Sequence, residues 1–252
     1  MTLSDGAALQ LAISEMNDSA CVLRQWLEDH SDDEIREASA LPGWTRAQVY
    51  AHLRGVSSAV ARQLDFAKRG ELIEMYDGGA DGRNADIARH AALEKPELLA
   101  ALEQSLGQLA AAVDALDDQD LAARVSYRDG TVVDALQAGW RELVIHHADL
   151  LIGFSSQNWS TGFSRHLFEF LEARIPEKTR LVLQPLGQQP VTLTNGNTSG
   201  KSYVITGQLN DIAAWLAGRK PVGQLEAWAA ADAVELPELL PWPSPALAPS
   251  QH

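Results

Sequence analysis

The stretch Leu41-Pro42-Gly43-Trp44-Thr45-Arg46-Ala47-Gln48-Val49 marks the beginning of a helix. A Pro-Gly turn is followed by Thr45 and Gln48 at the spacing of a capping box, in which each side chain accepts a hydrogen bond from the other residue's backbone N–H. The Trp before the cap and the Val after it stand at the positions of a hydrophobic staple. We therefore expect a helix that starts at Thr45 and runs to about Arg69.

Most of the first 155 residues share this helical character, because apolar side chains recur at every third or fourth position. The predicted helices span 7–30, 45–69, 84–90, 96–116 and 131–153. Thr131 is placed to cap the last of them. Breaks are expected at 31–34 and in the glycine-rich segment 77–82. Four long helices with short connections favour a four-helix bundle.

The pattern changes after about residue 155. Short β-branched runs at 180–184, 191–194 and 202–206 predict strands, separated by Pro190 and by the turn Asn195-Gly196-Asn197. Further helices are expected at 163–174 and 210–216. We predict a helical domain over 1–155, a small α+β domain over 156–235 and a poorly ordered, Pro-rich tail over 236–252.

The composition excludes several classes of protein. Of 252 residues, 34 are acidic and 20 are basic, which gives a formal charge of −14 without a dense Lys/Arg block. Such a chain is not expected to bind nucleic acid or an anionic membrane. No run approaches the roughly 18 to 20 apolar residues of a membrane span, and residues 1–10 lack the pattern of a signal peptide. We expect a soluble, cytoplasmic protein.

Cys21 is the only cysteine, so no intramolecular disulfide can form, which is typical of a reducing compartment. It lies among apolar positions of the first predicted helix. We expect it to be buried and structural, because a reactive thiol needs an electropositive and accessible setting. Any thiol chemistry would then depend on a thiol from outside the chain.

Residues that carry chemistry gather in the segment Glu142-Leu-Val-Ile-His146-His147-Ala-Asp149. Glu142, His146 and Asp149 fall within roughly 60° of one another around a helix, on an otherwise apolar surface. Burying Glu142 there without a partner would be costly, so a cation, a hydrogen-bond network or a metal must compensate for it. A Glu–His pair that only lines a wet crevice fits the same spacing. His147 points about 100° away from His146 and is expected in the core.

His52, on the helix that begins at Thr45, is the candidate for a second imidazole. Its helix neighbours are apolar, so a hydrogen-bonded core histidine is the alternative interpretation. Together with Glu142 and His146, it would complete a set of two histidines and one carboxylate. That set suits zinc with one coordination position left open for water or substrate.

Three segments resemble a known family. They are Leu41-Pro-Gly-Trp-Thr-Arg-Ala-Gln-Val-Tyr-Ala-His52-Leu, Gly82-Arg83-Asn84 and Arg141-Glu142-Leu-Val-Ile-His146-His147-Ala-Asp149-Leu150. In this order and at this separation they resemble the mycothiol-dependent maleylpyruvate isomerase family, within the DinB-like metalloenzymes. The resemblance runs through most of residues 5–155 and weakly through 207–219.

The resemblance implies a mainly α fold, in which a DinB-like four-helix bundle precedes a small α+β domain similar to sterol-carrier folds. The metal ligands that it implies are His52, Glu142 and His146. It also implies a catalytic arginine at Arg219 and cofactor-binding residues at Arg83 and Asn84. Arg219 fits a simpler role as well, that of a cation just beyond the C-terminus of a helix.

The activity that the resemblance implies is a zinc-dependent cis–trans isomerisation of maleylpyruvate to fumarylpyruvate, with mycothiol as cofactor. The thiolate would add to the double bond, the resulting single bond would rotate, and elimination would return the thiol. Another divalent metal could replace zinc. Arg219 or Arg83 could hold a substrate carboxylate by a bidentate contact.

Three other functions are compatible with the same residues. The metal site could serve a mycothiol-dependent S-transferase or a hydrolase that uses metal-bound water, or the bundle could be a non-catalytic small-molecule-binding module. A requirement for added thiol would exclude the hydrolase, and a metal-free protein of full stability would favour the module. The expected partners are a small-molecule thiol and an electrophilic, carboxylate-bearing substrate, on a monomer or a small homo-oligomer.

Overall fold

A computed structural model describes residues 5–195, 200–230 and 232–243. The chain divides into two compact units, residues 1–154 and 155–252, and each is described by itself. The helices of the first unit are α1 (Asp5–Asp29), α2 (Asp32–Arg36), α3 (Arg46–Lys68), α4 (Gly79–Ala91), α5 (Lys95–Asp114) and α6 (Val132–Asp149). Two short 3-10 turns, at Asp120–Ala122 and Tyr127–Asp129, connect α5 to α6.

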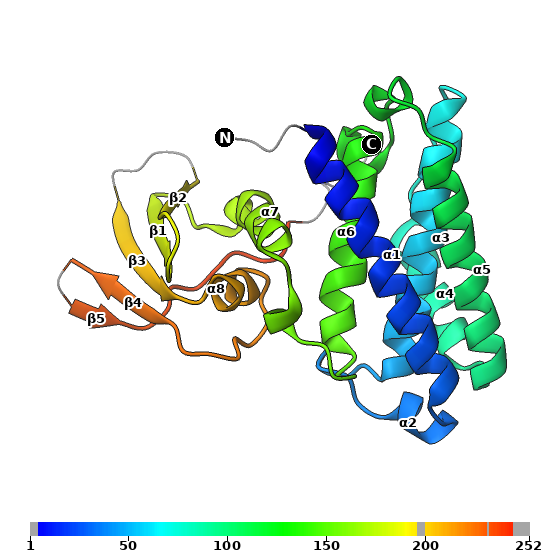
Figure 1. Ribbon diagram of the computed structural model, residues 1–252, viewed down its shortest axis with the longest axis horizontal. Coiled ribbons are helices and arrows are strands. Elements are labelled where there is room, and N and C mark those ends of the chain that lie inside the picture. The colour runs from blue at the N-terminus through cyan, green and yellow to red at the C-terminus, as the bar shows by residue number, and fades with distance from the viewer. Residues whose placement is uncertain (1–4, 196–199, 231, 244–252) are drawn as a thin grey trace, which may run out of the picture. The chain divides into compact units, whose positions relative to one another are not determined.

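The four long helices α1, α3, α5 and α6 form a bundle (Figure 1). Helix α3 packs against α5 and α6, helix α1 packs against α6 and α5, and α4 lies along α3. The largest fully buried side chains include Leu23 and Leu27 of α1, Tyr50, Leu53 and Leu64 of α3, Leu98 and Leu102 of α5, and Leu136 and Leu143 of α6. Each such burial stabilises the bundle by about 2 kcal/mol.

The predicted capping box at the start of α3 is confirmed. The Thr45 backbone N–H donates to Gln48 Oε1 at 2.8 Å, and the Gln48 N–H donates to Thr45 Oγ1 at 3.3 Å. Thr131 is the N-cap residue of α6, as predicted, and its backbone N–H donates to Asp134 Oδ2 at 2.7 Å. These caps fix where the two helices that carry the candidate ligands begin.

Two predicted breaks contain helix. The acidic segment after residue 30 forms the short helix α2, because Ser31 and Glu34 make a capping box of their own. Helix α4 begins at Gly79, inside the segment predicted as a loop. Its cap, Gly78, has a φ of 74°, and at Gly82 a Cβ would collide with the Asp77 carbonyl oxygen. The glycines that suggested a loop therefore permit a tight helix start.

The prediction that Cys21 is buried was wrong, because its side chain is exposed. The buried stripe of α1 runs through Leu9, Ala12, Met16, Ser19, Leu23 and Leu27. Cys21 lies two residues from both Ser19 and Leu23, which places it about 200° around the helix from that stripe. The polar residue Ser19 is buried at a core position of α1, although counting apolar residues would place it on the surface.

The second unit contains a five-stranded sheet of order β2-β1-β3-β4-β5. Its strands are β1 (Thr179–Pro185), β2 (Val191–Thr194), β3 (Lys201–Gly207), β4 (Glu226–Ala229) and β5 (Asp232–Val234). Strand β1 pairs in parallel with β3 and antiparallel with β2, while β3, β4 and β5 pair antiparallel. Helices α7 (Thr161–Leu171) and α8 (Leu209–Leu216) pack against each other.

Strands β4 and β5 were not predicted. Their sequences are short and contain alanine, and all three residues of β5 are exposed. Pairing of β4 to β3 and of β5 to β4, rather than the side-chain pattern, creates these strands. In the predicted tail, residues 236–243 form neither helix nor strand, and the Leu240 N–H donates to the Arg174 carbonyl at 2.7 Å. Residues 244–252 of that tail, and Gly196 and Asn197 of the predicted turn, lie outside the described residues.

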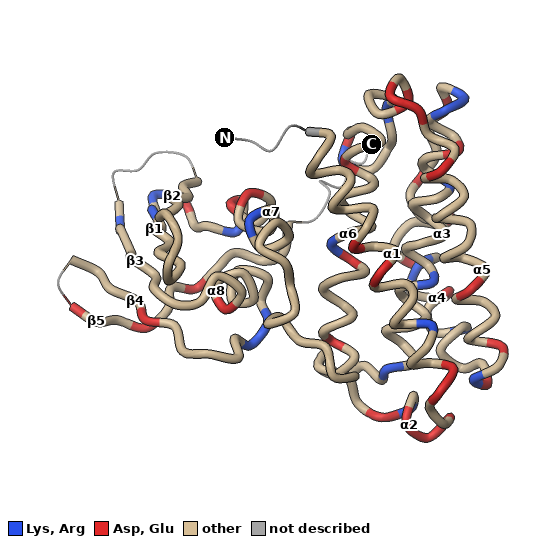
Figure 2. Tube along the Cα trace, in the orientation of Figure 1, with Lys and Arg blue, Asp and Glu red and all other residues tan. Residues whose placement is uncertain are grey.

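Basic and acidic residues are interspersed along the helices of the first unit (Figure 2). Among the described residues, no helix is both long and apolar enough to cross a membrane.

Candidate metal centre

The three residues expected to bind a metal lie together between two packed helices. His52 lies on α3, and Glu142 and His146 lie one turn apart on α6. Within this trio, one potential ligand atom from each side chain lies within 4.8 Å of the others. His52 is only 3% exposed, and the side chains of Glu142 and His146 are 32% and 15% exposed. The two imidazoles are therefore largely removed from water, and the Glu142 carboxylate between them is partly exposed.

A single carboxylate oxygen stands between two imidazole nitrogens. Glu142 Oε2 lies 2.8 Å from His52 Nε2 and 3.2 Å from His146 Nε2. The two rings are perpendicular, with centroids 4.7 Å apart. An ionised carboxylate can only accept, so each of these contacts needs a proton on the ring nitrogen. A cation at the centre would replace both protons and satisfy all three groups, so the donor set fits a divalent metal.

Asp149 fixes the outer side of His146. His146 Nδ1 lies 2.8 Å from Asp149 Oδ2, and Asp149 is only 1% exposed. Because the carboxylate accepts, the Nδ1–H of His146 donates, and this leaves Nε2 directed at Glu142. A carboxylate behind a histidine is the usual support for a metal-ligating imidazole.

The pKa values of Glu142, His52 and His146 are shifted by burial and by their hydrogen bonds. Burial alone would raise the pKa of Glu142, but hydrogen bonds from His146 and His52 outweigh it and hold this pKa well below its usual range. Burial lowers the pKa of His52, although its hydrogen bond to Glu142 acts in the opposite direction. For His146, burial is outweighed by hydrogen bonds to Asp149 and Glu142, so its pKa is raised. Glu142 is therefore an anion, as a metal ligand must be.

Arg83 contacts the outer nitrogen of His52. Its Nη2 donates to His52 Nδ1 at 3.1 Å, and its Nη1 donates to Asn84 Oδ1 at 3.3 Å. The guanidinium also lies 5.9 Å from the centre of the Tyr76 ring. Burial raises the pKa of Tyr76 to about 12, so this phenol keeps its proton at neutral pH. The structure thus brings Arg83 to the candidate metal ligands, with Asn84 beside it.

Two further residues singled out from the sequence are Arg219 and His147. Arg219 belongs to the second unit, where its Nη1 donates to the Ala217 carbonyl at 2.9 Å. His147 is buried in the core, as predicted, and its ring stacks on Phe154 with centroids 3.9 Å apart. Burial lowers the pKa of His147 to about 4, so it is neutral at physiological pH.

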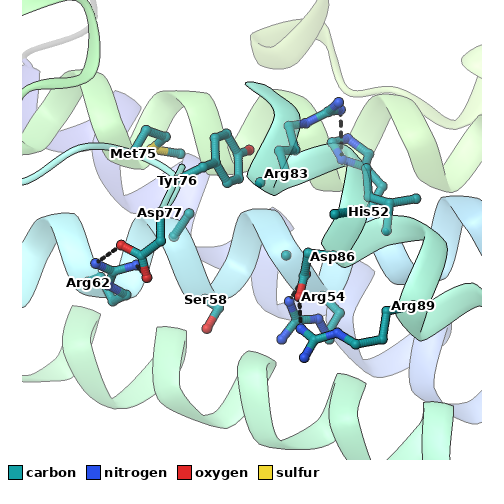
Figure 3. Close-up of a pocket in the computed structure, with 15 residues that line it drawn as sticks. His52, Arg54, Ser58, Arg62, Met75, Tyr76, Asp77, Arg83, Asp86 and Arg89 are labelled. Carbon is teal, nitrogen blue, oxygen red and sulfur yellow. Dashed lines mark hydrogen bonds and ion pairs between the residues drawn. The ribbon is translucent and has the colours of Figure 1, made fainter. Parts of the chain in front are cut away.

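A pocket of about 550 Å³ opens beside His52, between α3 and α4 (Figure 3). The charged side chains on its wall are Arg54, Arg62, Asp77, Arg83, Asp86 and Arg89. Sequence reasoning singled out only Arg83 among these. The available signal was the spacing of Arg54 and Arg62 on α3, eight residues apart and therefore about 80° from each other around the helix. A second signal was the three-residue spacing of Arg83 and Asp86, which places them on one face of α4.

Comparison with known proteins extends these observations. Residues 18–151 match the family described as the mycothiol maleylpyruvate isomerase N-terminal domain. A crystal structure of a mycothiol-dependent maleylpyruvate isomerase is similar to this chain, with 23% sequence identity and a TM-score of 0.77 over 92% of this chain and 95% of that one. A structure described as the H52A mutant of a mycothiol-dependent maleylpyruvate isomerase gives 22% identity, with the same TM-score and coverage.

A comparison with curated proteins found no match. At these identities the solved structures establish a shared fold. The predicted fold class, mainly α with a small C-terminal α+β part, is therefore confirmed.

Proposed function

Since the chain belongs to the mycothiol maleylpyruvate isomerase family, we propose that it converts maleylpyruvate to fumarylpyruvate with a divalent metal ion, zinc by preference, and mycothiol. The observation that carries this proposal is the convergence of one atom each from His52, Glu142 and His146 within 4.8 Å. Two imidazoles and one carboxylate leave a coordination position for a further ligand.

The metal would be held by His52, Glu142 and His146. A zinc ion bound there would lower the pKa of a thiol ligand, so that the thiol is a thiolate at neutral pH. Asp149 would keep the His146 ring in place, because the Nδ1–H already donates to it at 2.8 Å. Burial of His52 supports this arrangement, since water-excluded ligands hold a metal in a fixed geometry.

The chain's own thiol does not belong to this site. Cys21 is exposed on α1 and is not part of the metal cluster. Mycothiol would therefore supply the thiol, whose reversible addition to the substrate permits rotation about the former double bond. The chain's part would be to orient the substrate. Arg83 would receive a carboxylate, and its contact with His52 supports this role.

Arg219 and Asn84 complete the proposal as substrate-contacting and cofactor-contacting residues. Asn84 is supported by its contact with Arg83. The role of Arg219 is supported only by the sequence resemblance over residues 207–219. A role for Arg219 in holding substrate predicts that Arg219→Gln raises KM for maleylpyruvate and leaves the metal content unchanged.

The experiment is an assay of fumarylpyruvate formation by purified, zinc-loaded protein with mycothiol, with glutathione and with no thiol. We expect product only with mycothiol, and mycothiol should be recovered unchanged. Consumption of one mycothiol per substrate would instead identify an S-transferase. Loss of maleylpyruvate without any thiol and without formation of fumarylpyruvate would identify a hydrolase or another activity. No reaction with any thiol would favour a binding module.

A further inference from the structure

The pocket beside His52 has a charge opposite to that of the chain. Four arginines and two aspartates line it, which leaves a surplus of two positive charges, whereas the whole chain carries −14. A concave, partly desolvated wall concentrates such a field and attracts anions. The pocket therefore favours a ligand with about two negative charges.

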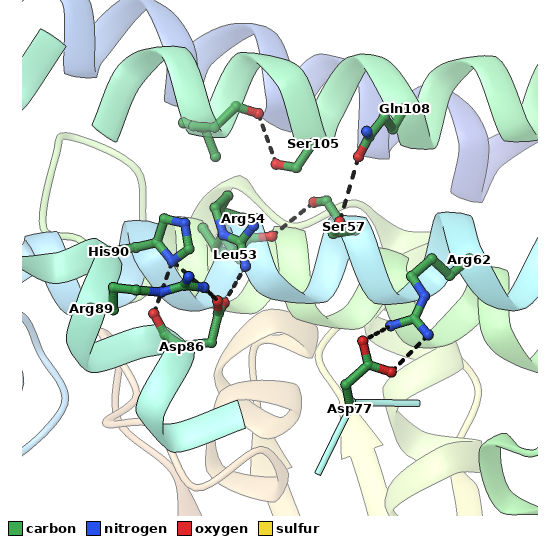
Figure 4. Close-up of polar contacts among 12 residues, drawn as sticks. Leu53, Arg54, Ser57, Arg62, Asp77, Asp86, Arg89, His90, Ser105 and Gln108 are labelled. Atoms are coloured by element: carbon green, nitrogen blue, oxygen red, sulfur yellow. Dashed lines mark hydrogen bonds and ion pairs between the residues drawn. The ribbon is translucent and has the colours of Figure 1, made fainter. Parts of the chain in front are cut away.

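The two surplus positive charges lie at two places on the pocket wall. Arg83, beside His52, makes no ion pair with a carboxylate among the described residues. The second place is Asp86, whose single carboxylate is shared by Arg54 and Arg89 (Figure 4). Two guanidiniums on one carboxylate leave one positive charge there. Arg62 contributes no surplus charge, because its Nη1 and Nη2 donate to the two carboxylate oxygens of Asp77 at 2.9 and 2.8 Å.

The Arg54 side chain has an N–H group without a hydrogen-bond acceptor among the described residues. Its side chain is 17% exposed, and its Nε lies buried without a hydrogen-bond partner among the described residues. A buried N–H left unpaired is costly, so an acceptor supplied by a ligand would be favoured at this guanidinium. Figure 3 shows Arg54, Asp86 and Arg89 together on one part of the pocket wall, with Arg83 next to His52 on another.

We propose that Arg54 and Arg89, held by Asp86, form a second carboxylate subsite, so that the pocket selects small dicarboxylates of one length. One carboxylate of the ligand lies at Arg83, beside the candidate metal ligands, and the other lies at Arg54 and Arg89. The inference rests on the proposed function for the identity of the neighbouring metal site. It adds the residues that distinguish dicarboxylates from monocarboxylates.

The test is isothermal titration calorimetry with succinate, glutarate and adipate, each paired with the monocarboxylate of the same chain length. For the best-fitting length, the wild type should bind the dicarboxylate about tenfold more tightly than its monocarboxylate, as expected for one charge-assisted contact. This preference should be lost in Arg54→Gln and in Arg89→Gln. The side chain of Arg89 is 69% exposed, so Arg89→Gln tests the subsite even where Arg54→Gln disturbs folding.

Arg62→Gln is the matched control, since it removes an equal charge from the same pocket at an arginine that Asp77 already neutralises. It should keep the preference for dicarboxylates. Equal binding of both ligand types by the wild type would overturn the proposal, and so would an equal loss in all three variants. Inorganic phosphate bound as tightly as the best dicarboxylate would identify a general anion site instead.

Titrations are run on zinc-free and zinc-loaded protein, with the metal content of each sample measured. A protein that binds no zinc would contradict the proposed function, while the preference of the pocket remains readable from the zinc-free titrations. The two proposals can therefore fail separately.

Discussion

His146 Nδ1 lies 2.8 Å from Asp149 Oδ2, three residues further along α6, and this contact points the other ring nitrogen at Glu142. Asp149→Asn would keep the size of the side chain but remove its charge. We expect zinc affinity to fall by about 10-fold to 100-fold, because carboxylates behind metal-binding histidines contribute on this scale. Competition with a chelator measures the affinity. Asp65→Asn, at an exposed position of α3, is the control, and an equal loss in both variants would refute a specific role for Asp149.

Arg83 is expected to oppose metal binding at His52. Its guanidinium can only donate, so in the structure His52 Nδ1 accepts. A neutral imidazole that binds a metal through Nε2 carries its proton on Nδ1, where it competes with Arg83. Arg83→Met should therefore bind zinc more tightly than the wild type, by up to about tenfold, since the loss of a nearby positive charge acts in the same direction. Weaker zinc binding in this variant would contradict the account.

The capping box of α3 stabilises the helix that carries His52. Thr45→Ala removes the side chain that accepts from the Gln48 N–H. We expect the free energy of unfolding to fall by about 1 kcal/mol. Urea denaturation followed by circular dichroism measures the change, and a value within a few tenths of the wild type would show that the cap is not needed.

The free energy of unfolding of the bundle should depend on pH through the ionisation of Asp86. Burial alone would raise its pKa, but the hydrogen bond from Arg89 and the charge of Arg54 outweigh it, so the pKa is lowered. A carboxyl whose pKa is lower in the folded state contributes stability above its unfolded pKa, about 3.9, and loses it as pH falls through the folded value.

Asp86→Asn should therefore be less stable than the wild type at about pH 6, and the difference should shrink as pH falls below about 4. Urea denaturation of both proteins over this range measures it. A difference that stays constant with pH would show that the charge of Asp86 does not stabilise the fold.

Signals local to the sequence predicted much of the bundle. The capping box of Thr45 and Gln48 placed the start of α3 correctly, because both partners lie within one turn. The candidate ligands could also be named, since Glu142 and His146 lie one turn apart on α6. What the sequence did not predict depends on contacts between segments that are distant in the chain.

The wall of the pocket is such a case. Asp86 reaches Arg54 only because α4 packs along α3, and α4 begins early only because glycine tolerates the close approach at residue 82. Strand β4 forms by pairing to β3, and β5 forms by pairing to β4, rather than by their own side-chain patterns. Cys21 was misplaced because counting apolar residues did not reveal that Ser19 takes the core position.

The central claim is that His52 completes a metal site with Glu142 and His146. The most direct test is the metal content of the purified wild type, His52→Ala and His30→Ala, measured by elemental analysis after zinc has been offered and excess removed. The account predicts about one zinc per chain in the wild type and in His30→Ala, whose histidine stacks on Trp26 of α1, and none in His52→Ala. Zinc retained in His52→Ala, or a wild type that takes up no metal, would contradict it.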